Sequence, residues 1–71
     1  MDIDCLQTFL DVARLESFTQ AAGVRHLTQP AVSRQIRRLE EDLGVKLFVQ
    51  TGRRVSLTAE GRVLLAEGAR V

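Results

Sequence analysis

Apolar residues in the first part of the chain recur every three or four positions, the period of a helix with one buried face. They are Leu6, Phe9, Leu10 and Ala13. Asp4 stands ahead of them with Gln7 three residues later, a pattern in which two side chains cap the first turn of a helix. The pattern predicts a first helix over residues 4–15 with Asp4 as its N-cap.

The same capping pattern returns at Ser17 and Gln20, where it predicts the start of a second, short helix. The small pair Ala21 and Ala22 allows this helix to pack closely against its neighbours. Residues 25–27 then form a connection to the next helix.

A third helix begins at Thr28, since threonine caps free N–H groups and Pro30 is tolerated in a first turn. Its apolar positions are spaced so that one stripe faces the core. They are Val32, Ile36, Leu39 and Leu43. Gly44 is the expected C-terminal stop.

After the third helix the period changes to that of short strands. Residues 47–49 and 55–57 form two strand-like pieces joined through residues 50–54, which predicts a hairpin with Arg53 and Arg54 at its tip.

Thr58 then caps a last helical segment, residues 59–71, whose intrinsic helicity Gly61 and Gly68 lower. Its apolar positions include Val63, Leu64, Ala66 and Val71. Three helices followed by a two-stranded wing describe a mainly α fold, the winged helix-turn-helix.

The composition admits one small domain with little chemistry of its own. The chain has 71 residues, 45% of them hydrophobic, so its core must consist of aliphatic side chains on short elements. Cys5 is the only cysteine and His26 the only histidine, which excludes an intrachain disulfide and leaves too few ligands for a structural zinc site. No nucleophile signature surrounds them. We expect neither a cofactor nor an enzymatic activity.

Two further patterns concern location. The longest apolar run, residues 63–66, is far shorter than the ~18 residues that a membrane span requires. Asp2 and Asp4 make the N-terminus acidic where a secretory signal would be basic. We expect a cytoplasmic protein without a membrane partner.

Positive charge is concentrated in the middle of the chain. Residues 25–54 hold seven basic and three acidic side chains, whereas residues 1–24 have a net charge of −3 and residues 55–71 of zero. Segregated charge of this kind indicates a polyanionic partner. Polar and basic residues form the arc of the third helix opposite its apolar stripe: Gln29, Pro30, Ser33, Arg34, Arg37 and Arg38. Glu40, Glu41 and Asp42 follow at the helix end, where negative charge is unfavourable, so the basic arc serves something other than helix stability.

The segment SFTQAAGVRHLTQPAVSRQIRRLEEDLG, followed by VKLF, TGRR and LTAEG, closely resembles the N-terminal DNA-binding domain of the LysR-type transcriptional regulators. The resemblance covers residues 1 to about 65. It implies that the helix opened by Thr28-Gln29-Pro30-Ala31 is the recognition helix. It also implies that residues 1–58 form the winged helix-turn-helix domain and that residues 59–71 begin the linker helix through which two copies dimerise.

The resemblance and the residue types agree on the roles of the basic arc and the wing. A recognition helix places its N-terminal residues against base edges in the major groove. We assign base contacts to Gln29, Pro30 and Arg34, and phosphate contacts to Thr28, Ser33, Arg37 and Arg38. Arg53 and Arg54 at the wing tip suit the adjacent minor groove or its flanking phosphates.

The chain departs from the family pattern at two places. Arg25 stands where members usually have Leu, and we expect Val24 to supply the missing apolar side chain through a slight adjustment of the second helix. Val49 and Gln50 stand where the family often has Glu-Arg, so one wing cation is lost and backbone affinity should fall modestly.

We therefore expect a sequence-specific module that binds double-stranded DNA and regulates transcription, forms a homodimer in a longer form, and contains no small-molecule effector site. An alternative is a protein-interaction winged helix that does not bind DNA. That reading requires an exposed apolar anchor on the third helix, and the basic arc offers none.

Overall fold

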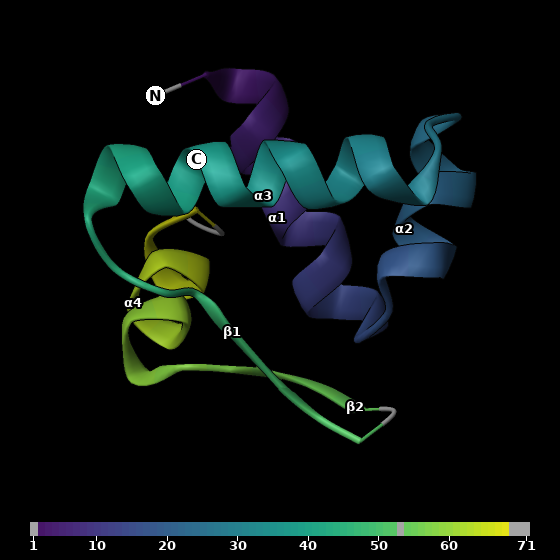
Figure 1. Cartoon of the computed structure of the whole chain (residues 1–71). Helices are drawn as coiled ribbons and strands as arrows, with labels where there is room; N and C mark the ends of the chain where they lie inside the picture. Colours follow the sequence, from purple (N-terminus) through teal and green to yellow (C-terminus); the bar gives the residue numbers. More distant parts are fainter. Residues whose placement is uncertain (1, 53, 69–71) are drawn as a thin grey trace.

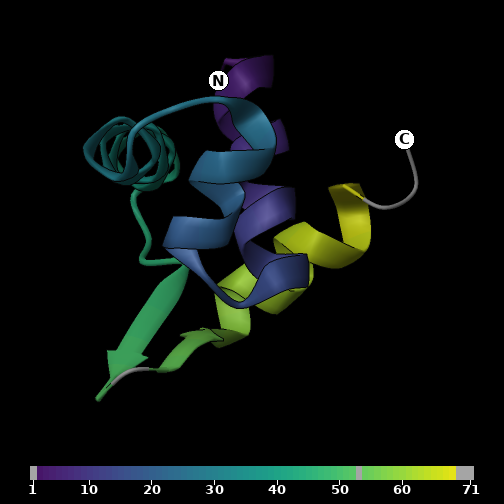
Figure 2. The same ribbon diagram turned by 90° about the vertical axis from the view of Figure 1, so that its right-hand side faces the viewer.

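The computed structural model describes residues 2–52 and 54–68, which form four helices and one two-stranded sheet (Figure 1). In chain order the elements are α1 (Ile3–Leu15), α2 (Phe18–Arg25), α3 (Gln29–Leu43), β1 (Phe48–Thr51), β2 (Arg54–Leu57) and α4 (Ala59–Gly68). Viewed along α3, the helix and the hairpin project from the same side of the molecule, whereas α4 leaves on the other side (Figure 2). The predicted mainly α winged helix-turn-helix is confirmed.

Helix α1 begins at Ile3, one residue before the predicted start at residue 4, and its N-cap is Asp2 in place of Asp4. The side chain of Asp2 accepts a hydrogen bond from the backbone N–H of Asp4 at 3.0 Å, so Asp2 is the N-cap and Asp4 lies inside the first turn. The prediction of Asp4 as cap was wrong because both positions carry a carboxylate able to cap. Ile3, now inside the helix, remains exposed.

The boundaries of α2 follow the capping pattern closely. The hydroxyl of Ser17 accepts from the N–H of Gln20 at 3.0 Å, which confirms this cap. The helix ends at Arg25, and its C-cap His26 adopts the left-handed conformation with φ 56°, so Arg25 belongs to α2 and not to the connection.

Helix α3 is capped at both ends as the sequence predicted. Thr28 accepts from the N–H of Ala31 at 3.2 Å, and Gly44 ends the helix with φ 73°, a conformation that costs glycine little. The stripe Val32, Ile36 and Leu39 is buried. Leu43 was expected in the same stripe but is 37% exposed, because the last residue of α3 borders a surface groove beside α4.

The hairpin is tighter than the sequence suggested. Phe48 pairs with Leu57 and Thr51 pairs with Arg54, so only residues 52 and 53 connect the strands in place of the expected residues 50–54. Gly52 has φ 62°, which suits a tight turn. Leu47 precedes β1 and is fully buried.

All three phenylalanines of the chain meet around β1. The ring of Phe48 lies 5.3 Å from that of Phe9 on α1 and 5.7 Å from that of Phe18 on α2, measured between centroids. Both separations fall in the range of favourable aromatic pairs. Phe48 therefore packs the hairpin against α1 and α2.

Gly61 marks the closest approach between α4 and the chain before β1. Its N–H donates to the hydroxyl of Thr58 at 3.0 Å, and that hydroxyl donates to the carbonyl of Lys46 at 2.6 Å. A Cβ on Gly61 would overlap the carbonyl oxygen of Leu47 and lie 2.9 Å from Cδ2 of Leu57. The sequence indicated only that Gly61 lowers helicity, whereas the structure requires glycine here.

Leu64 and Leu65 of α4 pack against the core, while Val63 is 64% exposed. The last three residues of the predicted segment 59–71 lie outside the described residues. Within residues 2–52 and 54–68, no helix is long and apolar enough to cross a membrane.

We predict that Gly61→Ala lowers the free energy of unfolding by about 1–3 kcal/mol, because the added methyl group forces the backbone of Leu47 to move. Gly23→Ala in α2 is the matched control, because a Cβ added at Gly23 has no neighbouring atom within 4 Å. This substitution should raise the free energy of unfolding by about 0.5–1 kcal/mol, the difference in helix propensity between alanine and glycine. Urea denaturation of both variants measures the difference. Equal midpoints for the two variants would contradict the close approach at Gly61.

Candidate nucleic-acid interface

The exposed face of α3 consists of two parallel rows of side chains, each spaced by four residues. Residues four apart on a helix lie above one another on the same face. The first row faces the hairpin and holds Gln29, Ser33 and Arg37. The second row holds Pro30, Arg34 and Arg38. Of these, Arg34 and Arg38 border a depression beside the start of α1. All six are solvent-accessible, Ser33 less than the others.

Each row borders a groove. The groove between the first row and the hairpin has a volume of about 560 Å³, and Gln50 of β1 forms part of its far wall. The groove beyond the second row has a volume of about 440 Å³ and is bordered by Asp2 at the start of α1. The helix therefore stands out as a ridge with a depression on either side.

The wing contributes one described cation to this side of the molecule. Arg54 opens β2 and is exposed. Arg53, the other predicted wing cation, lies outside the described residues. In Figure 2, α3 and the hairpin lie on the same side of the molecule, and hairpin residues Val49, Gln50 and Val55 border the same groove as the first row of α3.

The acidic end of α3 has a structural task that the sequence did not reveal. Glu40 accepts a hydrogen bond from the N–H of Leu47 at 2.8 Å and lies 3.9 Å from the ammonium of Lys46. It thereby ties the chain after Gly44 back to α3. The signal was invisible in the sequence, because a carboxylate seven residues before its partner has no local pattern.

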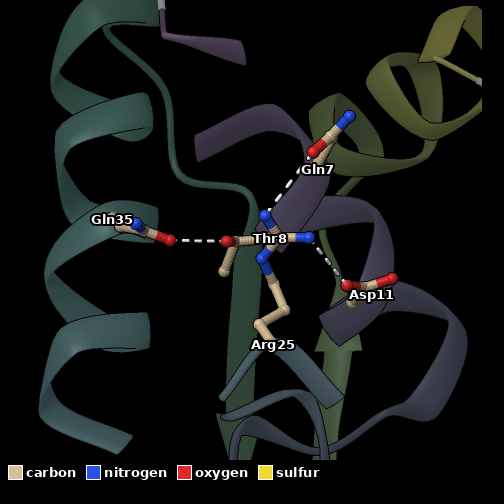
Figure 3. Close-up of polar contacts among 5 residues, drawn as sticks. All are labelled: Gln7, Thr8, Asp11, Arg25 and Gln35. Atoms are coloured by element: carbon tan, nitrogen blue, oxygen red, sulfur yellow. Dashed lines mark hydrogen bonds and ion pairs between the residues drawn. The ribbon is translucent and has the colours of Figure 1, made fainter. Parts of the chain in front are cut away.

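Arg25 packs on α1 and replaces the apolar contact expected from Val24. Its guanidinium lies 3.3 Å from the carboxylate of Asp11 and 3.5 Å from the side-chain oxygen of Gln7 (Figure 3). Val24 is 60% exposed, so the expectation that it fills the gap was wrong. The long arginine stem reaches α1, where an ion pair takes the place of an apolar side chain.

A second polar contact joins α1 to α3 beside this ion pair. The hydroxyl of Thr8, fully buried, donates to the side-chain oxygen of Gln35 (Figure 3). Gln35 follows Arg34 directly, so this bond lies on the inner side of the second row. All three helices of the helix-turn-helix are thus joined by polar contacts through α1.

One residue assigned to base contact already has a partner. Thr19 of α2 donates to the side-chain oxygen of Gln29 at 3.4 Å. Thr28, by contrast, uses its hydroxyl to cap α3. The sequence predicts a phosphate contact for Thr28 and indicates no role for Thr19.

The remaining candidate chemistry is inert. Burial, together with the nearby carboxylate of Asp2, raises the pKa of the Cys5 thiol, so this side chain behaves as a small buried apolar group. Among the residues that the structure describes, no three His, Cys, Asp or Glu side chains gather to hold a metal ion. His26 is the turn residue that the sequence predicted.

The family model described as "Bacterial regulatory helix-turn-helix protein, lysR family" matches residues 3–62, which is most of the chain. The chain belongs to the lysR family. The resemblance noted in its motifs is confirmed.

The curated relatives most similar to this chain include proteins described as HTH-type transcriptional regulators. An uncharacterized HTH-type regulator of Bacillus subtilis, YxjO, is 54% identical over 65 residues, which is 92% of this chain and 22% of that protein. A regulator from the ibpB-leuC intergenic region of Azotobacter vinelandii is 48% identical over 71 residues, all of this chain and 49% of that protein. The chain thus spans between a fifth and a half of these two relatives.

Solved structures of lysR-family DNA-binding domains superpose closely on the chain. The BenM DNA-binding domain in complex with catB site 1 DNA has a TM-score of 0.93 and 37% identity, covering 99% of this chain and 78% of that one. The CbnR DNA-binding domain in complex with DNA gives a TM-score of 0.93 and 37% identity, covering 99% and 80%.

We predict that Arg25→Ala lowers the free energy of unfolding by about 1–2 kcal/mol, because it leaves the Asp11 carboxylate half-buried without its partner. The Nε of Arg25 is buried without a hydrogen-bond partner among the described atoms, which keeps the net value of the pair modest. A double-mutant cycle with Asp11→Ala, read by urea denaturation, should give a coupling of about 0.5–1 kcal/mol. Strictly additive losses would show that the ion pair contributes nothing.

Proposed function

We propose that this chain is the DNA-binding module of a LysR-type transcriptional regulator. In this proposal the protein is cytoplasmic and binds double-stranded DNA sequence-specifically. Residues 1–58 form the DNA-binding unit in this proposal, and residues 59–71 begin a linker helix. The observation that carries it is the ridge of α3 with its two rows of polar and basic side chains, on the same side as the hairpin.

The shape of this surface suits a duplex. The major groove admits one α-helix, and the depressions on either side of α3 leave room for the two phosphate backbones that border the groove. The close superposition on domains solved in complex with DNA supports the same orientation.

Position along α3 divides the residues by role. Gln29, Pro30 and Arg34 lie in the first two turns, where a recognition helix meets base edges. Glutamine pairs with adenine and arginine with guanine through two hydrogen bonds each. Thr28, Ser33, Arg37 and Arg38 contact phosphates in this proposal.

In this proposal Arg53 and Arg54 bind in the minor groove adjacent to the major-groove contacts, or to the phosphates that flank it. The register of the hairpin sets Arg54 opposite Thr51, beside the two-residue turn. Arginine is favoured where the minor groove is narrow, as in A·T-rich sequence.

The protein-interaction alternative has less support. A protein partner needs an apolar anchor to bury, and neither row of α3 contains a large apolar side chain. Leu43, the exposed apolar residue of α3, lies at the far end of the helix.

We further propose that two copies associate through α4 in a longer form of the protein. Leu43, Val45, Val63 and Leu64 border a shallow groove of about 320 Å³ between α3 and α4. No residue of the two α3 rows borders this groove, so a dimer formed there leaves both recognition helices free to engage DNA.

Arg34→Ala is expected to relax base preference at one position of each half-site and to cost about 1–3 kcal/mol on the preferred sequence. Arg37→Ala is the matched control, because a phosphate contact weakens all sequences nearly equally and lowers the salt slope by roughly one. Titration of a selected duplex and a scrambled duplex at several salt concentrations separates the two. Equal losses for Arg34→Ala on both duplexes would remove it from the base-contacting set.

We expect the 71-residue chain alone to be largely monomeric at micromolar concentration, because α4 is only 10 residues long and isolated helices of this length are marginal. Fusion of a C-terminal coiled coil should raise affinity for a two-half-site duplex by a factor of about 10²–10⁴ through effective concentration. Sedimentation and DNA titration measure both. A tight dimer without the fusion, and no gain with it, would contradict this expectation.

A further inference from the structure

We infer that Thr19 is a positioning residue for base recognition: it fixes the orientation of the Gln29 side-chain amide and thereby decides which bases Gln29 accepts. The inference rests on the proposed DNA-binding function and deepens it. Its starting observation is the hydrogen bond from the Thr19 hydroxyl to Oε1 of Gln29 at 3.4 Å.

Both partners stand on backbone that is held in place. Thr19 is the second residue of α2, whose start is fixed by the Ser17 cap and by the contact of Phe18 with Phe48. Gln29 is the first residue of α3, whose start is fixed by the Thr28 cap. The start of α3 lies beside α2 (Figure 1), so this pair spans the turn of the helix-turn-helix.

The environment favours one orientation of the amide. The first turn of α2 carries the positive end of the helix dipole, which attracts the carbonyl oxygen of an amide and repels its NH₂ group. Thr19 lies in that turn and adds a hydroxyl donor. A β-branched side chain also has few rotamers, so its hydroxyl is well placed to hold a partner.

An amide held in this way presents its Nε2 hydrogens outward, away from α2. In the major groove these donors match acceptor atoms: N7 of either purine, O6 of guanine or O4 of thymine. Adenine is still paired through two bonds, because Nε2 donates to N7 and the second lone pair of Oε1 accepts from N6. Cytosine offers no acceptor for Nε2. The N4 amino group of cytosine is itself a donor and is rejected. A glutamine without this restraint turns its amide over and accepts from cytosine as well.

The test is selection of bound sequences from random duplex DNA by dimeric coiled-coil fusions of the wild-type chain and of its variants Thr19→Val, Thr19→Ser and Gln29→Ala. Valine keeps the shape of threonine and lacks the hydroxyl, whereas serine keeps the hydroxyl. We expect Thr19→Val to lose about tenfold of the discrimination against cytosine at one position, which corresponds to one neutral hydrogen bond. Thr19→Ser should restore the wild-type preference.

Gln29→Ala identifies the position concerned, because its preference should vanish there and Thr19→Val should then change nothing further. Thermal unfolding of each variant checks that the fold is intact. A Thr19→Val variant with unchanged preferences would overturn the inference. So would a uniform loss on all sequences with a smaller salt slope, since Thr19 would then be a phosphate contact. If the wild-type fusion selects no sequence at all, the proposed function itself fails and the inference with it.

Discussion

The packing of Phe48 against Phe9 of α1 and Phe18 of α2 is the contact on which the position of the hairpin beside α3 depends. The hairpin has only two strands, and an isolated two-stranded hairpin is marginally stable in water. Phe9 and Phe18 hold it against the helical core through the ring of Phe48. Because Phe18 is the first residue of α2, the same cluster joins the hairpin to α1 and to the start of α2. Phe18 and Phe48 also line the groove between α3 and the hairpin, so this aromatic contact forms part of its wall.

Local rules recovered most of the fold, because helix caps act over three or four residues. Ser17, Thr28 and Gly44 were identified from their immediate neighbours, and the structure confirms all three. Asp2 and Asp4 show the limit of such rules, since two carboxylates two residues apart satisfy the same pattern. The hairpin was found, but its register depends on pairing across strands, which short sequence patterns determine only loosely.

The features that sequence could not reveal are contacts between residues distant along the chain. Arg25 and Asp11 are 14 residues apart, and Thr8 and Gln35 are 27 apart. The need for glycine at position 61 arises from a carbonyl 14 residues earlier. The basic arc of α3 was visible from helical period alone, whereas its division into two rows with separate grooves required the positions of α1 and the hairpin. The assignment of individual residues of these rows to bases and phosphates stays a prediction.

The dimensions of the folded chain limit how much sequence information one copy can collect. Its longest axis is 26 Å, which spans about 8 base pairs at roughly 3.4 Å per step, less than one turn of B-DNA. A DNA sequence of that length recurs by chance many times among the ~10⁶–10⁹ competing sites of a genome. A pair of such sequences separated by a fixed number of base pairs occurs far more rarely. Helix α4 leaves the molecule on the side away from α3 (Figure 2). In the dimer proposed above, this direction lets the two copies read two such sequences at a fixed spacing, and the combined site is long enough to be unique in a genome.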